Sequence, residues 1–420
     1  MLDIKFIREN KELIKKNCLN RNVKVDIDRL LLVDEDRKKQ LKKIEELRSL
    51  RKQKSKGKPK EDEIAGLRQM GEEISVLEKE LEGVEKEFSS LMYKIPNLTH
   101  PESPIGGEDD YKEVYKNKEP NEFDFEPQDH EELMTNLDLL DFDRANKVSG
   151  AKFYFYKNEM VRLNQALINY SLDTVAPYGY ELLETPDLAK NEILTGIGFN
   201  PRGEETQVYS IENTDLSLIG TAEITVGGYH AGEVLDLSHG PKKYLALSHC
   251  FRTEAGSYGR TSKGLYRVHQ FTKLEMFIFC KPEESEKYHE EILDIEKKLV
   301  DGLEIPYRII DIASGDLGGP AYRKFDIEAW MTMKKTGDRQ GGYGEITSCS
   351  NCTDYQARRL NIKYKKDDGS AGFVHTLNGT AMVLSRFPIA IAENFQNKDG
   401  SISIPKALQK YVSFSSIGRK

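Results

Sequence analysis

The sequence of 420 residues lacks any apolar run of the ~20 residues that a membrane-spanning helix requires. Its first ten residues, Met1 to Asn10, contain no apolar secretion core and include acidic side chains, which organellar targeting peptides avoid. We therefore expect a cytoplasmic protein that does not bind membranes.

Cysteine is scarce, with five residues in the chain. Their odd number and irregular spacing argue against a disulfide framework. Cys349 and Cys352 form a C-x-x-C pair, but no second Cys or His pair stands at the spacing of a structural zinc site. We interpret the pair as ordinary packing, with metal or redox use as the alternative.

The chain also lacks the excess of positive charge that is typical of nucleic-acid-binding proteins, since its net charge is −8. DNA is therefore not an expected partner. One segment differs: residues 51–60 read R-K-Q-K-S-K-G-K-P-K, with six positive charges and no acid. This basic cluster either keeps an exposed turn soluble or contacts phosphate groups.

Apolar residues in the region 30–94 form two runs with a coiled-coil pattern; the second run alternates spacings of three and four, and the first is looser. Gly57 and Pro59 separate two such runs and predict a tight turn. Arg37 and Arg51 interrupt the first run. The first run comprises Leu30, Val33, Leu41, Ile44 and Leu47, and the second Leu67, Met70, Ile74, Leu77, Leu81, Val84, Phe88 and Leu91. We predict an antiparallel helical hairpin with arms at about 27–55 and 61–94 and the basic cluster at its tip.

Pro and Gly residues between 95 and 107 indicate a linker, and the pattern changes beyond it. Segments 272–279 and 325–333 alternate apolar and polar residues as strands do, and 285–303 has the apolar stripe of a helix. Strands in runs favour an antiparallel sheet in an α+β domain. We predict an N-terminal domain over 1–109 and a second domain over 110–420.

The segment from Phe251 to Glu275 is the most unusual part of the second domain, because it places charged residues on two strands joined by a Gly-rich loop. Alternation predicts that Arg252 and Glu254 share one strand face, and that Arg267, Phe271 and Glu275 share another. The guanidinium fork suits a polyphosphate, and Phe271 offers a flat surface to a purine. An exposed hairpin with cross-strand ion pairs is the alternative.

The same segment closely resembles the second signature motif of class II aminoacyl-tRNA synthetases in its seryl form. Residues 179–186 (G-Y-E-L-L-E-T-P) resemble the first motif, which lies at the dimer interface in that family, and 378–386 (N-G-T-A-M-V-L-S-R) resemble the third. Residues 218–223 (L-I-G-T-A-E) are similar to the loop that recognises serine, and the hairpin to the arm that grips tRNA. No G-x-x-x-x-G-K-[ST] phosphate loop occurs, which agrees with this family.

The resemblance implies a role for each matching residue. Arg252 would hold the serine carboxylate and the α-phosphate, and Arg267 and Arg386 the outer phosphates, as the catalytic residues. Serine would be bound by Thr221, Ala222, Glu223, Glu275 and Thr380. ATP would be bound by Arg252, Thr253, Glu254, Val268, Phe271, Glu345, Ile346, Thr347, Ser348 and Arg386. Magnesium would be held by Glu345 and Ser348. Transfer RNA would be bound by Lys52, Lys54, Lys56, Lys58 and Lys60.

The resemblance thus implies a homodimeric ligase that activates serine with ATP and loads it onto tRNA(Ser). It leaves open whether selenocysteine tRNA is a second substrate. Three alternatives remain: a ligase of the same fold that loads an amino acid onto a carrier protein, a class II synthetase with a different amino-acid specificity, and a non-catalytic coiled-coil module that binds tRNA. The loop from Thr221 to Glu223 and the arm together disfavour a different amino-acid specificity. The carrier ligases lack a long arm and bind zinc, which this sequence does not favour.

Overall fold

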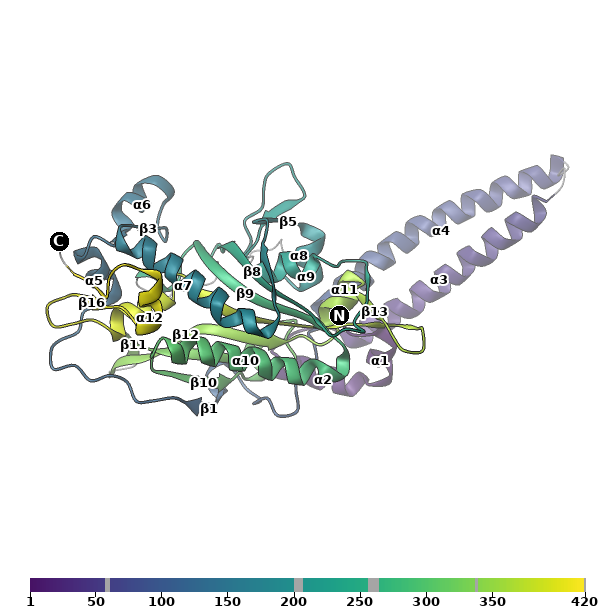
Figure 1. Cartoon of the computed structure of the whole chain (residues 1–420). Coiled ribbons are helices and arrows are strands. Elements are labelled where there is room, and N and C mark those ends of the chain that lie inside the picture. The colour runs from purple at the N-terminus through teal and green to yellow at the C-terminus, as the bar shows by residue number, and fades with distance from the viewer. Residues whose placement is uncertain (57–60, 200–206, 256–263, 337–338, 419–420) are drawn as a thin grey trace. The chain divides into compact units, whose positions relative to one another are not determined.

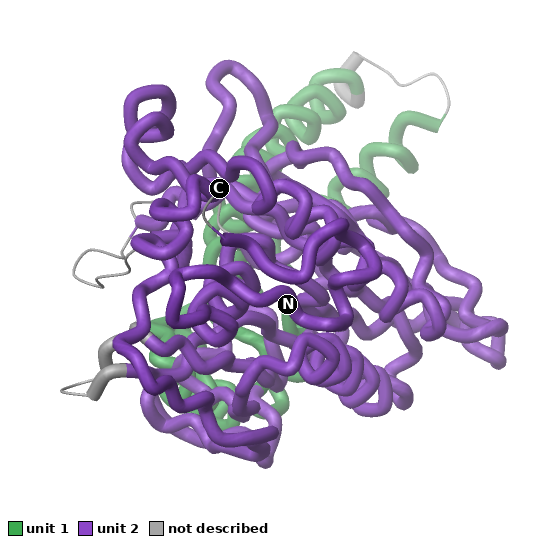
Figure 2. The backbone as a smooth tube through the Cα atoms, turned by 60° about the vertical axis from the view of Figure 1, so that its left-hand side comes forward, with its two compact units in different colours: residues 1–98 green, residues 99–420 purple. Residues whose placement is uncertain are grey.

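The computed structural model describes residues 1–56, 61–199, 207–255, 264–336 and 339–418. The chain forms two compact units, residues 1–98 and 99–420 (Figure 2). This division falls before the boundary that the sequence predicted after residue 109. In the part of the chain that the structure describes, no helix is both long and apolar enough to cross a bilayer.

The first unit is a helical hairpin preceded by two shorter helices. Its helices are α1 (Ile4–Glu9), α2 (Lys11–Asn20), α3 (Ile27–Lys54) and α4 (Glu61–Lys94). Helix α3 begins after Asp26, whose carboxylate accepts the Arg29 N–H at 2.9 Å and so caps the helix. Helices α3 and α4 run antiparallel (Figure 1), and their ion pairs include Arg29 with Glu87 at 2.7 Å.

The seam between α3 and α4 contains apolar and cationic contacts. Buried and half-buried members of the predicted heptads form a core of Leu41, Ile44, Leu47, Ile74, Leu77 and Leu81. The arginines that interrupt the first run also face α4. The Arg37 guanidinium lies 4.4 Å from the centroid of the Phe88 ring, and a Cβ at Gly71 would lie 3.3 Å from Cζ of Arg51. The interruption therefore alters the chemistry of the seam without ending it.

The second unit is built on an eight-stranded sheet (Figure 1). In spatial order its strands are β1 (Lys112–Lys116), β10 (Tyr307–Asp311), β11 (Arg323–Thr336), β12 (Arg339–Asn351), β15 (His375–Val383), β9 (Gln270–Cys280), β8 (Lys242–Phe251) and β4 (Glu181–Glu184). Neighbours pair antiparallel except β4 and β8, which are parallel. The predicted α+β class with an antiparallel sheet is confirmed.

Helices cover both faces of this sheet, and alternation along β9 shows how. Leu274, Met276 and Ile278 join the main core with the helices α7 (Glu159–Val175), α10 (Ser285–Gly302) and α12 (Phe387–Asn394). Phe277 and Phe279 point to the other side and pack with α8 (Asn191–Ile197), α9 (Ala222–Gly228) and α11 (Tyr355–Leu360). The predicted strand at 272–279 and helix at 285–303 are both confirmed.

Smaller elements surround this core. The short helices α5 (His130–Asn136) and α6 (Phe142–Ser149) precede α7. The minor sheets are β14 (Ala371–Phe373) with β13 (Lys363–Lys365) and β7 (Val234–Leu235); β16 (Ile402–Ser403) with β17 (Ser416–Ile417); β2 (Leu140–Asp141) with β3 (Phe155–Tyr156); and β5 (Leu188–Lys190) with β6 (Leu216–Leu218). Single-turn 3₁₀ helices include η3 (Gly264–Tyr266), which lies beside the site described next.

Candidate active site

A cavity of about 220 Å³ lies in the second unit, on the α9 side of the large sheet. Its walls come from β9, β12 and β15, from the segment that follows β8, and from other adjoining segments. The predicted site residues that line it are Thr221, Glu223, Arg252, Glu254, Arg267, Val268, Phe271, Glu275, Glu345, Ile346, Ser348, Thr380 and Arg386. Residues from five separate stretches of sequence thus meet in one space.

The two strands of the charged segment are shorter than the sequence predicted. β8 ends at Phe251 and β9 begins at Gln270, so Arg252 and Arg267 lie just outside them. The prediction that Arg252 and Glu254 share a strand face was wrong, because Glu254 has a left-handed backbone with φ of 52°. Its carboxylate instead accepts a hydrogen bond from Nη1 of Arg267 at 3.3 Å, and the Arg252 guanidinium lies 5.3 Å from the Phe271 ring centroid.

One end of the cavity is organised around the carboxylate of Glu275. Its Oε2 atom accepts a hydrogen bond from the Thr221 hydroxyl and forms an ion pair with Nζ of Lys273. Glu275 and Lys273 are both buried. Lys273 stands two residues from Glu275, so the alternation of β9 already placed it on this face, although no role was predicted for it.

A second carboxylate, Glu223, lies at the same end. Thr221 caps α9 by accepting the Glu223 N–H, which fixes Glu223 in the first turn. Two amides donate to Oε1 of Glu223: Nε2 of Gln356 at 2.7 Å and Nδ2 of Asn378 at 3.0 Å. Burial, followed by repulsion from Glu275, raises the pKa of Glu223 to about 7. The sequence predicted no role for Gln356 or Asn378.

A second part of the cavity lining pairs Arg386 with Glu345. Nη1 of Arg386 lies 3.0 Å from Oε1 of Glu345 and also donates to the Glu345 carbonyl oxygen at 3.0 Å. The guanidinium carbon lies 5.0 Å from the centroid of the Tyr266 ring. Burial alone would raise the pKa of Glu345, but Arg386, Lys324 and Arg252 together hold it below its usual value. The carboxylate is therefore ionised at neutral pH.

A β-bulge turns Glu345 and Ser348 toward the same cavity although they are three residues apart. Opposite β11, Thr347 pairs with Ile327 and Glu345 pairs with Glu328, so Ile346 is the extra residue. Asp326 pairs with Ser348 across the ladder. Its Oδ1 atom is buried and has no hydrogen-bond partner among the described residues, and burial raises its pKa to about 7. This corner therefore gathers oxygen donors, as a hard cation requires.

Several predicted residues do not line the cavity. Ala222 is the first residue of α9 and is fully buried. The Thr253 N–H donates to the Gln207 carbonyl oxygen at 3.1 Å, and Thr347 points to the other face of the sheet.

In the first unit, Lys52 and Lys54 lie on α3 and Lys56 follows it, all three exposed, whereas Lys58 and Lys60 lie outside the described residues. Cys349 and Cys352 are buried, and neither forms a disulfide among the described residues.

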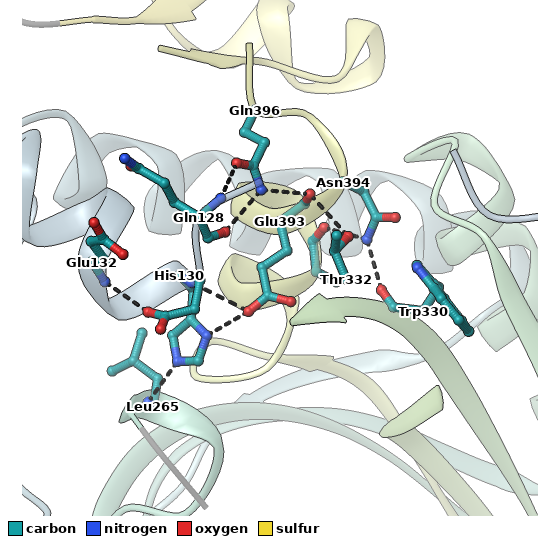
Figure 3. Close-up of polar contacts among 11 residues, drawn as sticks. Gln128, His130, Glu132, Leu265, Trp330, Thr332, Glu393, Asn394 and Gln396 are labelled. Atoms are coloured by element: carbon teal, nitrogen blue, oxygen red, sulfur yellow. Dashed lines mark hydrogen bonds and ion pairs between the residues drawn. The ribbon is translucent and has the colours of Figure 1, made fainter. Parts of the chain in front are cut away.

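A buried polar network supports the cavity from the side of α5 and α12 (Figure 3). Nδ1 of His130 lies 2.7 Å from Oε1 of Glu393, and Nε2 of His130 accepts the Leu265 N–H at 3.2 Å. Because a backbone N–H can only donate, the ring proton sits on Nδ1. His130 thus connects α12, which follows Arg386, with η3, which carries Tyr266.

The antiparallel sheet, the cluster of arginines and the paired carboxylates define a class II aminoacyl-tRNA synthetase. The family model "tRNA synthetase class II core domain (G, H, P, S and T)" matches residues 207–395. The model "Seryl-tRNA synthetase N-terminal domain" matches residues 1–99. The first match lies within the second unit, and the second match spans the first unit.

Comparison with individual proteins identifies the family within this class. The serine–tRNA ligases of Dictyoglomus turgidum and Treponema denticola are each 51% identical to this chain, with all of both sequences covered. A crystal structure of seryl-tRNA synthetase from Pyrococcus horikoshii complexed with ATP has a TM-score of 0.89 and 37% identity over all of both chains. The cytoplasmic serine–tRNA ligase from Naegleria fowleri in complex with AMP has a TM-score of 0.86 and 32% identity, covering 100% of this chain and 99% of that one. The chain belongs to the seryl-tRNA synthetase family.

Proposed function

We propose that this chain activates serine with ATP, releasing pyrophosphate, and transfers the seryl group from seryl-adenylate to the 3′ end of tRNA(Ser). The observation that carries the proposal is one cavity lined by two carboxylates, Glu223 and Glu275, and by Arg252, Arg267 and Arg386. The part around the two carboxylates is its acidic end and the part around Arg386 is its arginine-rich end, with Arg252 acting on Glu223 and on Glu345. The serine ammonium is positive and suits the carboxylates, and the ATP phosphates are negative and suit the arginines. Identity of 51% with serine–tRNA ligases over the full length supports the same conclusion.

The acidic end is the proposed serine pocket. Serine presents an ammonium group and a hydroxyl, both of which donate hydrogen bonds, and Glu223 and Glu275 can accept them. Thr221 and Lys273 hold the Glu275 carboxylate, so it meets the substrate already oriented. Alanine keeps the ammonium but lacks the hydroxyl, so it would leave the acceptor of that hydroxyl unpaired, which disfavours it. Thr380 lines the same cavity, whereas the predicted serine contact Ala222 does not.

The arginine-rich end is the proposed ATP site. The serine carboxylate attacks the α-phosphorus, the bond to the bridging oxygen breaks, and pyrophosphate leaves. Arg252 would hold the serine carboxylate and the α-phosphate, and Arg267 and Arg386 the outer phosphates, with Phe271 and Glu254 at the adenine. Positioning and charge stabilisation by these groups require no protein nucleophile. The remaining predicted ATP contacts are Thr253, Val268, Ile346 and Thr347.

A magnesium ion fits the oxygen-rich corner of this site. Glu345 and Ser348 would hold it, and the buried, unpartnered Oδ1 of Asp326 adds a third oxygen nearby. Carboxylate and hydroxyl oxygens are suitable donors for this cation, which neutralises phosphate charge when bound. The ionised state of Glu345 at neutral pH favours the same assignment.

The remaining assignments concern partners and location. The arm, with Lys52, Lys54 and Lys56 exposed near its turn, is the proposed tRNA-binding element of the N-terminal domain. The first-motif segment includes β4, an edge strand of the large sheet with an exposed Leu182, and is the proposed surface for homodimer formation. A cytoplasmic location suits a translation enzyme. Selenocysteine tRNA remains a candidate second substrate.

Charging of tRNA with radiolabelled serine tests the whole proposal. We expect serine-dependent, ATP-dependent labelling of purified tRNA(Ser) and none of a tRNA that lacks a long variable arm. Selenocysteine tRNA, assayed in parallel, decides whether it is a second substrate. Serine-dependent adenylate formation without any charging would leave the carrier-protein ligase as the better account.

A further inference from the structure

The central strands β12 and β15 stop pairing beside the cavity. Their register runs from Asn351 opposite Leu377 to Cys349 opposite Gly379, and it goes no further within the described parts of both strands. A bulge lies on each strand at this point. Ile346 is the extra residue of β12 against β11, and Ala381 is the extra residue of β15 against β9.

The side chain of Glu296 connects the two strands where the ladder ends. Glu296 belongs to α10, which covers the sheet face opposite the cavity, and it is fully buried. Its Oε1 accepts the Thr380 N–H at 2.9 Å, and its Oε2 accepts the Thr347 hydroxyl at 2.8 Å. Gly379 permits this approach, because a Cβ there would lie 2.9 Å from Oε1 of Glu296.

The strands that Glu296 connects carry opposite ends of the proposed site. Thr380 pairs with Glu275 across β15 and β9, at the serine end. Thr347 precedes Ser348 and follows the bulge that turns Glu345 into the cavity, at the nucleotide end. We infer that Glu296 is a positioning residue that fixes the distance between the serine end and the nucleotide end of the cavity. This inference rests on the proposed function.

A purely space-filling role would not call for a carboxyl group at this position. Full burial raises the pKa of Glu296 well above its ordinary value, and a buried polar group is destabilising unless its hydrogen bonds are made. An apolar side chain would fill the same volume without that cost. The two hydrogen bonds to separate strands are what the carboxyl adds.

Three variants separate positioning from packing. In Glu296→Gln, the amide oxygen can still accept the Thr380 N–H and the amide nitrogen can donate to the Thr347 hydroxyl. We expect its KM for serine in ATP–pyrophosphate exchange to stay within about threefold of wild type. Glu296→Ala should raise that KM about tenfold or more, in the range observed when groups that orient site residues are removed. Leu299→Ala, a buried change on the same helix, should lower the melting temperature and leave the KM unchanged.

Hydrogen exchange tests the connection without relying on activity. The Thr380 amide should exchange slowly in wild type and in Glu296→Gln, and faster in Glu296→Ala, whereas Leu299→Ala should not affect it selectively. An unchanged Thr380 exchange rate in Glu296→Ala, or equal KM changes in Glu296→Ala and Leu299→Ala, overturns the inference. If wild type shows no exchange of pyrophosphate with serine while the amide result holds, the proposed function fails and the connection between the strands stands.

Discussion

The Arg386 guanidinium and the Glu345 carboxylate lie 3.0 Å apart at one end of the cavity, with the Tyr266 ring 5.0 Å from the same guanidinium. A partly buried ion pair of this kind orients both partners, and removal of either one leaves the other charge without its partner. Arg386 therefore has two tasks in the proposed reaction: it fixes Glu345 and it meets the phosphates.

Arg386→Lys tests these two tasks, because lysine keeps the charge but lacks the planar fork. We expect kcat/KM for ATP to fall about 100-fold or more, as when one preorganised charge-stabilising donor is removed. KM for serine should change much less. Arg323→Lys, at a guanidinium paired with Asp311 at 2.8 Å outside the cavity lining, is the matched control. A similar loss in both variants would contradict a specific role in the site.

The raised pKa of Glu223 predicts that serine binding weakens at acidic pH. Its pKa is raised to about 7 by burial and by Glu275, so the protonated form increases as pH falls through 7. In the proposed serine pocket, the ionised form would bind the serine ammonium. KM for serine should therefore rise by up to about tenfold per pH unit below 7, as expected for one titrating group. Glu223→Gln should bind serine weakly, and its KM for serine should not rise further below pH 7. An equal rise of KM at acidic pH in that variant would show that another group titrates.

The basic cluster predicts salt-dependent tRNA binding. Replacing the lysines at 52, 54, 56, 58 and 60 with glutamine should reduce the slope of log K against log salt by about 0.7–0.9 for each phosphate that the variant no longer neutralises. ATP–pyrophosphate exchange without tRNA should be unaffected and serves as the control for folding. An unchanged slope would make the cluster a solubilising turn.

An exposed apolar side chain on the edge strand β4 leads us to predict a homodimer. Leu182 is 55% exposed on this strand, which is unusual for a large apolar side chain. Leu182→Asp should shift the protein toward monomer in sedimentation at micromolar concentration. Val114→Asp, at a 45% exposed residue of β1 on the opposite sheet edge, should not. A wild-type protein that sediments as a monomer would remove this surface from consideration.

The sequence predicted most of this fold because periodicity is a local property. The heptads predicted both helices of the arm, and the alternation from Thr272 to Phe279 predicted the residues that β9 turns to each side. The strand ends were harder. Arg252 lies just beyond β8, since the backbone leaves the sheet before the left-handed Glu254, and alternation does not reveal where a strand stops.

Most site residues that belong to a motif were predicted, although Lys273 and Asn378 lie within two of the motifs and were assigned no role. Other residues were missed because only the tertiary fold brings them to the site. Gln356 lies on α11 and reaches Glu223 across 133 positions of sequence. Asp326 enters through its register with Ser348. The bulge at Ile346 changes which side chains face the cavity, and no composition signal marks a single extra residue in a strand. These features depend on pairing between distant strands.

ATP–pyrophosphate exchange with each of the twenty amino acids, in the presence of magnesium and the absence of tRNA, tests the central claim most directly. The account predicts exchange with serine and none above background with alanine or threonine. Exchange driven by a different amino acid would preserve the fold and the ATP end of the cavity but contradict the serine pocket. No exchange with any amino acid would contradict the catalytic account as a whole.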